Sequence, residues 1–329
     1  MHRRSRLAGR ERPPMSVDPV YADVLAAAAR IAPYVRVTPL TSAVALSARL
    51  GAEVELKCEN LQETGAFKAR GACNAVFALP AGVAARGVVT HSSGNHAAAL
   101  ARAARLRAIP ASIVMPRGAA RVKRDAVAAF GATIVECEPT LAAREAAAAA
   151  LVAASGATLV HPYDEPLVIA GQGTLVLELA AATAAPDAVL VPVGGGGLLS
   201  GVALACRTLW PQVRVVGVEP QGADDAQRSL RSGMLQAQPD PRTIADGLRG
   251  ALSARTLRLI AAHASDIVTV GEDSIVAAMR LVHELLGLVI EPSAAVPLAA
   301  LLEGKVVGRR ILVVLSGGNV DPEALPWRV

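Results

Sequence analysis

One lysine stands in the segment TGAFKARGACNAV, residues 64–76, after a Thr-Gly turn signal and at the start of an Ala-rich helical pattern. Lysine is scarce in this chain, because only Lys57, Lys68, Lys123 and Lys305 occur among its 33 basic residues. Unlike arginine, lysine can lose its proton and act as an amine nucleophile, and burial can lower its pKa by up to about 3–5 units. Lys68 is therefore a candidate nucleophile, and an ordinary surface lysine is the alternative.

A second segment, VPVGGGGLLSGVAL at residues 191–204, places four glycines between an apolar run and a helical pattern. Glycines let backbone N–H groups converge, and a helix N-terminus adds about half a positive charge. The loop therefore predicts a phosphate site, with a tight strand-to-helix turn as the alternative. Neither the G-x-G-x-x-G dinucleotide pattern nor the Gly-Lys-Ser/Thr of a P-loop fits it, so the phosphate belongs to something other than NAD or ATP.

A third segment, THSSGNHAAAL at residues 90–100, gathers four polar side chains between an apolar run and a helical pattern. Hydroxyls, an amide and the free N–H groups of a helix start suit a carboxylate ligand. An ordinary helix cap is the alternative for this segment alone. The residues concerned are Ser92, Ser93, Asn95 and His96.

A fourth loop, SGGN, ends the apolar run of VVLSGGNVD with Ser316 as its first residue. Taken alone, it is equally well explained as turn chemistry. Combined with the other three segments, it completes a pattern: a neutral lysine forms a Schiff base with an aldehyde, and pyridoxal 5′-phosphate combines an aldehyde with a phosphate. The four segments together indicate this cofactor and a small amino-acid substrate.

Short apolar runs alternate with Ala- and Leu-rich helical patterns along the whole chain. This alternation predicts repeated βα units and a mainly parallel sheet covered on both faces. Ligands of such sheets bind at the carboxyl ends of the strands, where the polar loops fall. The runs expected to form strands are VEL, GVVTH, ASIVM, ATIVE, ATLV, AVLVPV, VRVVGVE, DIVTV and RRILVVL.

The composition is that of a globular chain, with 329 residues of which 53% are hydrophobic and 19% charged. Residues 1–14 hold five arginines and one glutamate, so they carry four of the five net positive charges. The remaining chain is nearly neutral, which argues against a nucleic-acid partner. The stretch 188–206 has no charge and is long enough for a membrane helix, but four glycines and Pro192 interrupt it. We therefore expect a buried strand, a glycine loop and a helix there instead. We expect a cytoplasmic protein with no membrane partner, whose four cysteines, lacking C-x-x-C spacing, are reduced structural thiols.

Together the motifs resemble the fold-type II pyridoxal-phosphate enzymes, in the threonine/serine dehydratase and serine racemase branch, over about residues 20–320. The resemblance implies that Lys68 holds the cofactor, that Phe67 lies beside its ring and that Ser316 hydrogen-bonds the pyridine nitrogen. It implies that SSGNH grips the substrate carboxylate and that Asn95 also lies near the 3′-oxygen of the cofactor. HPYDEP, AGQGT and TIADGL also read like this branch. The implied phosphate loop is Gly194, Gly195, Gly196, Gly197 and Leu198.

The same resemblance implies a tryptophan synthase β-like α/β fold, with two open, mainly parallel sheet domains and the cofactor between them. We expect a disordered basic tail at residues 1–15. A large cofactor-binding domain is expected from residues 16–81 and 165–329, and a small mobile domain, which closes over the substrate, from residues 82–164. Relatives of this kind are usually homodimers or homotetramers, which is the assembly we expect.

The acidic segment VEPQGADD, residues 218–225, resembles the cation site of some members of this branch. The implied ligands are the carboxylates of Glu219 and Asp225 and the backbone carbonyl of Ala223. Oxygen ligands of this type suit Mg²⁺ or another divalent cation. A solvated acidic turn is the alternative.

The expected activity is that of an ammonia-lyase, which converts L-threonine or L-serine to a 2-oxo acid and ammonia by α,β-elimination. Lys68 would remove the α-proton. The resemblance places Ser93 on the opposite side of the α-carbon, where it could return a proton, so serine racemase activity is one alternative. Dehydration of 3-hydroxyaspartate is a further alternative. Tyr163 replaces the Phe or Asn of relatives and bears on substrate preference. A catalytically silent pyridoxal-phosphate carrier is the non-enzymatic alternative.

Overall fold

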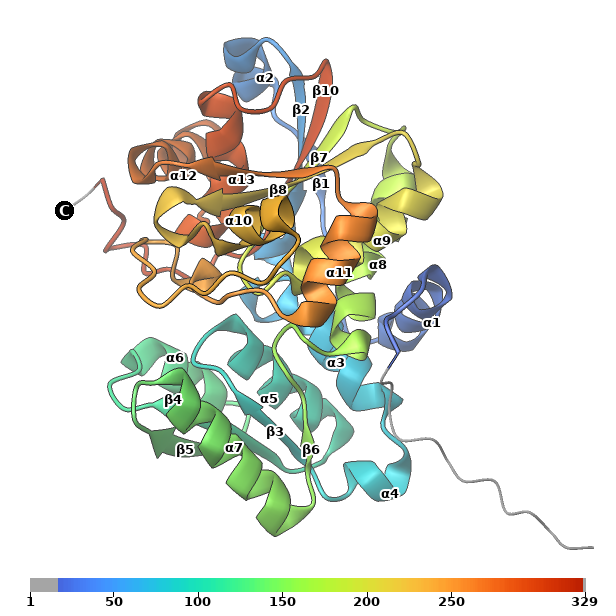
Figure 1. The fold of residues 1–329 in the computed structure, drawn as a ribbon, viewed down its shortest axis with the longest axis vertical. Helices are drawn as coiled ribbons and strands as arrows, with labels where there is room; N and C mark the ends of the chain where they lie inside the picture. The colour runs from blue at the N-terminus through green and yellow to red at the C-terminus, as the bar shows by residue number, and fades with distance from the viewer. Residues whose placement is uncertain (1–16, 328–329) are drawn as a thin grey trace, which may run out of the picture.

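The larger of two sheets has six strands in the order β1-β2-β10-β7-β8-β9 (Figure 1). This structure, a computed structural model, describes residues 17–327, so the tail expected at residues 1–15 lies outside the described residues. β1 runs antiparallel to β2, and every other pair in the sheet is parallel. The strands are β1 (Leu40–Ser42), β2 (Glu53–Cys58), β7 (Ala188–Pro192), β8 (Arg214–Pro220), β9 (Asp266–Val270) and β10 (Arg310–Leu315).

The smaller sheet has four parallel strands in the order β5-β4-β3-β6. All four come from within residues 82–164 and form a separate lobe below the larger sheet in Figure 1. The two sheets confirm the predicted α/β fold with two open, mainly parallel sheet domains. The strands are β3 (Val88–His91), β4 (Ala111–Pro116), β5 (Thr133–Cys137) and β6 (Thr158–Leu159).

Helices cover both faces of the larger sheet, as the continuous apolar runs of its strands predict. Successive side chains of a strand point to opposite faces. In β7, Leu190 packs in the core formed with α12 and α13, whereas Val189 and Val191 pack in the core formed with α8 and α9. These helices are α8 (Pro166–Ala182), α9 (Gly197–Leu209), α12 (Glu272–Leu286) and α13 (Pro292–Leu302).

The remaining α-helices complete the two lobes and the junction between them. They are α1 (Tyr21–Ile31), α2 (Val44–Leu50), α3 (Lys68–Ala78), α4 (Ala81–Ala84), α5 (Asn95–Arg107), α6 (Arg121–Ala128), α7 (Leu141–Ser155), α10 (Asp225–Ser232) and α11 (Ala254–His263).

Helix α3, which begins at Lys68, lies where the two lobes meet (Figure 1). Its Cys73 and Val76 pack with Leu100 of α5 in the core of the smaller lobe. On another side it approaches α8 of the larger lobe so closely that a Cβ at Gly171 would lie 2.6 Å from the Cα of Gly71. Lys68 is therefore held at the junction by packing on both lobes.

A buried ionic network fixes the same helix to the larger lobe. Arg70, two residues after Lys68 on α3, has a fully buried side chain that pairs with Glu59 at 2.8 Å and with Glu178 at 2.6 Å. Lys57 on β2 lies 2.5 Å from Glu178. Two positive and two negative side chains thus balance one another, as burial of charge requires.

The uncharged stretch 188–206 forms strand β7, the glycine loop and most of α9. Among residues 17–327, no helix is long and apolar enough to cross a membrane.

Candidate active site

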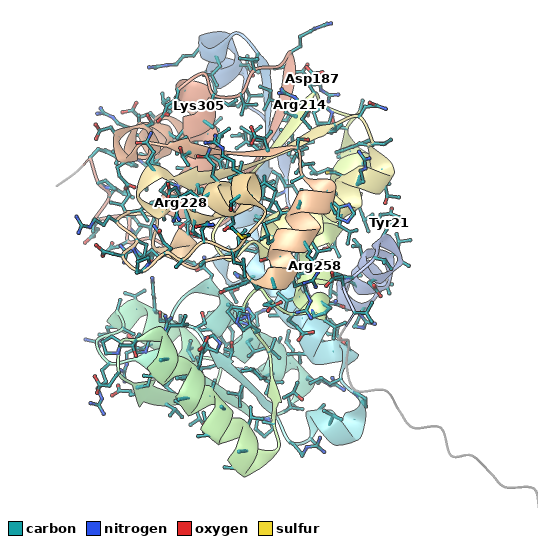
Figure 2. The ribbon with its side chains drawn as sticks, in the orientation of Figure 1. Tyr21, Asp187, Arg214, Arg228, Arg258 and Lys305 are labelled. Carbon is teal, nitrogen blue, oxygen red and sulfur yellow. The ribbon has the colours of Figure 1, made fainter. Side chains whose placement is uncertain are left out.

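The carboxyl ends of the parallel strands in the larger sheet face the smaller lobe. Asp187 and Arg214, at the amino ends of β7 and β8, lie on the far side of the molecule in Figure 2. The glycine loop follows β7 and the SGGN loop follows β10, so both loops lie at the end of the sheet that faces the smaller lobe. This is the edge at which ligands bind in open α/β sheets.

Lys68 is the first residue of α3, and its amine is held in a partly buried position. Its Nζ donates a hydrogen bond to the carbonyl oxygen of Pro162 at 2.8 Å and lies 5.1 Å from the centre of the Phe67 ring. Burial lowers the pKa of Lys68 to about 8, although the carboxylate of Glu291 opposes the shift. A lysine with this pKa is neutral in a substantial fraction of molecules near neutral pH, as a nucleophile requires.

The glycine loop joins β7 to α9, and Gly196 takes the left-handed conformation with φ of 84°. Within residues 17–327, the backbone N–H groups of Gly195, Gly197 and Leu198 make no hydrogen bond to the protein. A Cβ at Gly195 would overlap the ring of Tyr163, which packs over the loop. The loop thus presents free N–H donors at a helix N-terminus and has no space for side chains.

Ser316 follows β10 and is brought beside Lys68 by pairing of two loops. Its carbonyl oxygen accepts a hydrogen bond from the Phe67 N–H at 3.0 Å, and Ala66 and Gly317 form an antiparallel bridge. The Ser316 residue is 2% exposed. The structure therefore joins the lysine motif and the SGGN motif, which are about 250 residues apart in the sequence.

The SSGNH loop follows β3 and leads into α5. Ser92, Ser93 and Asn95 are partly buried, and the Gly94 N–H donates to Ser92 Oγ at 3.4 Å. His96 is placed differently from the others, because it is 1% exposed and its Nε2 lies 3.2 Å from the carbonyl oxygen of Val160. Burial holds the pKa of His96 well below its usual range. Its imidazole is thus neutral and supports the loop from inside the smaller lobe.

Two residues at this edge had no role assigned from the sequence. The Asn95 Nδ2 donates to both carboxylate oxygens of Glu291, at 2.9 and 3.1 Å, and the Asn95 Oδ1 accepts from the Nδ2 of Asn319 at 2.8 Å. Asn319 is the last residue of SGGN, and Glu291 directly precedes the first residue of α13, so each resembled ordinary turn or helix-start chemistry. Burial raises the pKa of Glu291 to about 7.

A row of aromatic rings lines the smaller lobe next to Lys68. The ring of His161 meets His91, the last residue of β3, at 5.1 Å and meets Tyr163 at 4.6 Å, both edge to face. Burial lowers the pKa of His161 to about 4, and the charge of Lys68 contributes to this shift. Both histidines lie at the carboxyl end of the smaller sheet and are neutral near pH 7, because burial also lowers the pKa of His91.

Arg144, in the first turn of α7, adds a positive charge at this end of the row. Burial lowers the pKa of His91 and raises that of Tyr163; the charge of the adjacent Glu145 raises both pKa values, and the smaller contribution of Arg144 lowers both. Its Nε is buried and has no hydrogen-bond partner among the described residues. A buried guanidinium N–H without an acceptor is costly, so this position is complementary to an anionic group.

The proposed cation ligands lie at the carboxyl end of β8. Glu219 accepts hydrogen bonds from the N–H groups of Ala226 and Gln227, at 3.2 and 2.5 Å, and Asp225 accepts one from Leu252 at 3.3 Å. Burial raises the pKa of Glu219 to about 8 and that of Asp225 to about 6, and the Asp225 charge adds to the shift of Glu219. Across the described chain, no group of three or more His, Cys, Asp or Glu side chains could hold a metal. Fewer than three such side chains therefore come together at this turn in the described chain.

The side chains and loops gathered around Lys68 fit pyridoxal 5′-phosphate. The amine of Lys68 can become neutral near physiological pH, and the free N–H groups at the start of α9 can hold a phosphate. Ser316 provides a neutral hydroxyl beside Phe67.

Comparison with known proteins agrees with this fit. The family model described as pyridoxal-phosphate dependent enzyme matches residues 31–317. The chain is 48% identical to beta-hydroxyaspartate dehydratase of Paracoccus denitrificans, covering 94% of this chain and 99% of the relative, and 45% identical to serine racemase of Arabidopsis thaliana, covering 89% and 90%. The structure of maize serine racemase superimposes with a TM-score of 0.92 at 42% identity, covering 95% of this chain and 97% of the other. The chain therefore belongs to the fold-type II pyridoxal-phosphate dependent enzymes, in the branch that contains the ammonia-lyases and serine racemases.

Proposed function

We propose that this enzyme is an ammonia-lyase whose substrate is 3-hydroxyaspartate, which it converts to a 2-oxo acid and ammonia. One observation carries the choice of substrate: the buried Nε of Arg144 has no partner among the described residues. A second carboxylate on the substrate would supply the missing acceptor, and pairs of this kind are stronger than neutral hydrogen bonds. The name of the Paracoccus denitrificans relative supports the same class of substrate.

Bound pyridoxal phosphate would supply a ring that withdraws electrons from the α-carbon of the substrate. The N–H groups of Gly195, Gly197 and Leu198 would hold its phosphate, and Phe67 would lie beside its ring. The hydroxyl of Ser316 would meet the ring nitrogen without holding a proton on it, because it carries no charge. These contacts would fix the reacting carbon near Lys68.

The chain's own residues account for substrate binding and proton transfer in this proposal. Ser92, Ser93 and Asn95 would bind the α-carboxylate with hydroxyl and amide donors at the start of α5. The neutral amine of Lys68 would remove the α-proton. Arg144 would bind the side-chain carboxylate and so place the 3-hydroxyl, which would take up a proton from the Lys68 ammonium and leave as water. Hydrolysis of the released unsaturated product by water would then give the 2-oxo acid and ammonia.

L-threonine and L-serine are the second candidate substrates, and serine racemization is the third activity. Neither threonine nor serine carries a second carboxylate, so neither would use the Arg144 charge. Ser93 lies in the substrate loop and would have to return a proton to the opposite face of the α-carbon in a racemase. The Arabidopsis thaliana relative is named a serine racemase, which supports measuring D-serine formation by this enzyme.

A divalent cation at Glu219, Asp225 and the Ala223 carbonyl is a further part of the proposal. Burial raises the pKa of both carboxylates, and the charge of Asp225 raises that of Glu219 further, so a bound cation would stabilise the ionised pair. Since the proposal takes ligands from three protein groups, water molecules would complete the coordination shell.

The substrate is tested by comparing Arg144→Gln with wild type on 3-hydroxyaspartate and on L-serine, following release of the 2-oxo acid and formation of D-serine. Loss of one charge-assisted contact corresponds to about 1.5–3 kcal/mol, so kcat/KM for 3-hydroxyaspartate should fall about 10- to 100-fold, while that for L-serine changes little. Arg121→Gln is the matched control, because Arg121 also lies at a helix start in the smaller lobe but has a 93% exposed side chain. An equal loss on both substrates would remove the argument for a second carboxylate. Faster formation of D-serine than of any 2-oxo acid would make the enzyme a racemase.

A further inference from the structure

Both ends of the Asn95 carboxamide are occupied, by groups of opposite hydrogen-bonding type. The Nδ2 end faces Glu291, whose two carboxylate oxygens lie 2.9 and 3.1 Å away. The Oδ1 end accepts from the Nδ2 of Asn319 at 2.8 Å. Asn319 Nδ2 also donates to the carbonyl oxygen of Thr64 at 2.8 Å, and a backbone carbonyl can only accept.

These partners fix which way the Asn95 amide points. If the amide turned over, its oxygen would lie about 3 Å from the Glu291 carboxylate, which in its ionised form only accepts, and in either form of Glu291 its NH₂ would face the NH₂ of Asn319. The Asn319 amide cannot turn to compensate, because its oxygen would then face the Thr64 carbonyl. Only one orientation of the Asn95 amide therefore satisfies all three neighbours.

Two glycines make room for the two partners. A Cβ at Gly317 would lie 2.6 Å from Glu291 Oε1, and a Cβ at Gly65 would overlap the amide of Asn319. Both glycines belong to motifs singled out in the sequence, the Thr-Gly turn before Lys68 and SGGN. The close approach of the Glu291 and Asn319 side chains thus explains why these positions have no side chain.

The three side chains also connect the two lobes. Asn95 begins α5 of the smaller lobe, whereas Glu291 begins the turn into α13 and Asn319 follows β10 in the larger lobe. Thr64 lies in the segment that leads to Lys68. The network therefore joins the substrate loop to both loops that flank the cofactor position.

We propose that Glu291 and Asn319 are positioning residues that together orient the Asn95 carboxamide toward bound pyridoxal phosphate. One N–H of Nδ2 satisfies the two oxygens of Glu291, and the second N–H is directed to an oxygen of the cofactor. Neither partner touches the reacting atoms in this scheme, since both act through Asn95. The proposal rests on membership of the family and is independent of which substrate the enzyme uses.

The test measures the dissociation constant of pyridoxal phosphate for the apoprotein, by equilibrium dialysis and by the absorbance band of the bound cofactor. Glu291→Gln and Asn319→Ala are each made in the wild-type background and in the Asn95→Ala background. Each change should weaken cofactor binding about 5- to 10-fold with Asn95 present, the equivalent of about one hydrogen bond. In the Asn95→Ala background each should change the dissociation constant less than about twofold, because residues that act through a shared partner are not additive.

The matched control is Glu303→Gln, at the other end of α13, where the carboxylate accepts one hydrogen bond from the Gly271 N–H at 2.8 Å. This control should leave the dissociation constant unchanged in both backgrounds. The same loss of affinity with and without Asn95 would overturn the proposal, since a general structural role does not depend on Asn95. If Glu291→Gln fails to fold, Asn319→Ala decides the question alone, because Asn319 is exposed and its removal leaves no cavity.

Discussion

The amine of Lys68 donates a 2.8 Å hydrogen bond to the carbonyl oxygen of Pro162, which ties the start of α3 to the loop after β6. A carbonyl can accept from an ammonium group or from a neutral amine, and it accepts more strongly from the charged group. The contact therefore holds Lys68 in place in both protonation states and does not itself favour the neutral amine. Burial then decides the balance, and it lowers the pKa of Lys68 to about 8.

The first prediction concerns the capture of pyridoxal phosphate by the apoprotein. Only the neutral amine attacks an aldehyde, and with a pKa of about 8 the neutral fraction of Lys68 rises from about one tenth at pH 7 to about nine tenths at pH 9. The rate constant for capture should therefore rise about ninefold over this range and level off above pH 9. Stopped-flow absorbance after mixing apoprotein with the cofactor measures it.

The control for this experiment is Lys305→Arg, since the Lys305 side chain is 44% exposed and lies in the part of the larger lobe away from the smaller lobe in Figure 2. It should reproduce the wild-type profile, while Lys68→Ala should give no capture. A rate that keeps rising tenfold per pH unit up to pH 10 would mean that Lys68 titrates like an exposed lysine.

The second prediction concerns the buried ionic network of Arg70, Lys57, Glu59 and Glu178. Arg70→Met should lower the free energy of unfolding by about 3–5 kcal/mol, because it leaves the buried carboxylate of Glu59 without its cationic partner, whereas Glu178 keeps Lys57. Urea denaturation of the apoprotein measures the loss. Arg117→Met is the control, because the Arg117–Glu138 pair has side chains that are 66% and 63% exposed and should contribute about 0–1 kcal/mol. Equal effects of the two variants would show that the network contributes no more than a surface pair.

The strands were predictable because their signal is local. All nine apolar runs identified in the sequence form strands, β2 to β10, and the polar loops after β3, β7 and β10 belong to the candidate site. Strand β1 was not predicted. It is only three residues long, at an edge of the sheet, and its sequence LTS has no apolar run.

Long-range side-chain contacts were not predictable in the same way. Glu291 lies 196 positions from Asn95, and a Glu-Pro pair at a helix start is ordinary local chemistry. Arg144 stands in an Ala-rich helix, where an arginine resembles one more solvated charge. Glu291 is distinguished by its buried contact with Asn95, and Arg144 by a buried Nε that has no partner among the described residues. The contact of Glu291 depends on how the two lobes pack.

The third prediction concerns Glu219 and Asp225, whose raised pKa values of about 8 and 6 make stability depend on pH. In the unfolded chain these groups titrate near 4.5 and 3.8. The folded state therefore binds protons more tightly, and its free energy of unfolding falls as pH rises from about 4 to about 8. A divalent cation binds only the ionised carboxylates, so it should restore the stability that is lost over this range.

Thermal unfolding at pH 5.5 and at pH 8, with and without Mg²⁺, measures this linkage. At a cation concentration of about 100 times the dissociation constant the gain would be about 2.7 kcal/mol, and the increase in Tm should be much larger at pH 8 than at pH 5.5. Glu219→Gln should remove the cation effect and flatten the dependence on pH, because a neutral amide cannot be ionised. Asp240→Asn is the control, since Asp240 is an exposed carboxylate that pairs with Arg242 at 2.8 Å and is not among the charges that raise the pKa of Glu219 or Asp225. A cation effect that survives in Glu219→Gln would place the binding elsewhere, because the turn then keeps only one ionisable carboxylate of the proposed pair.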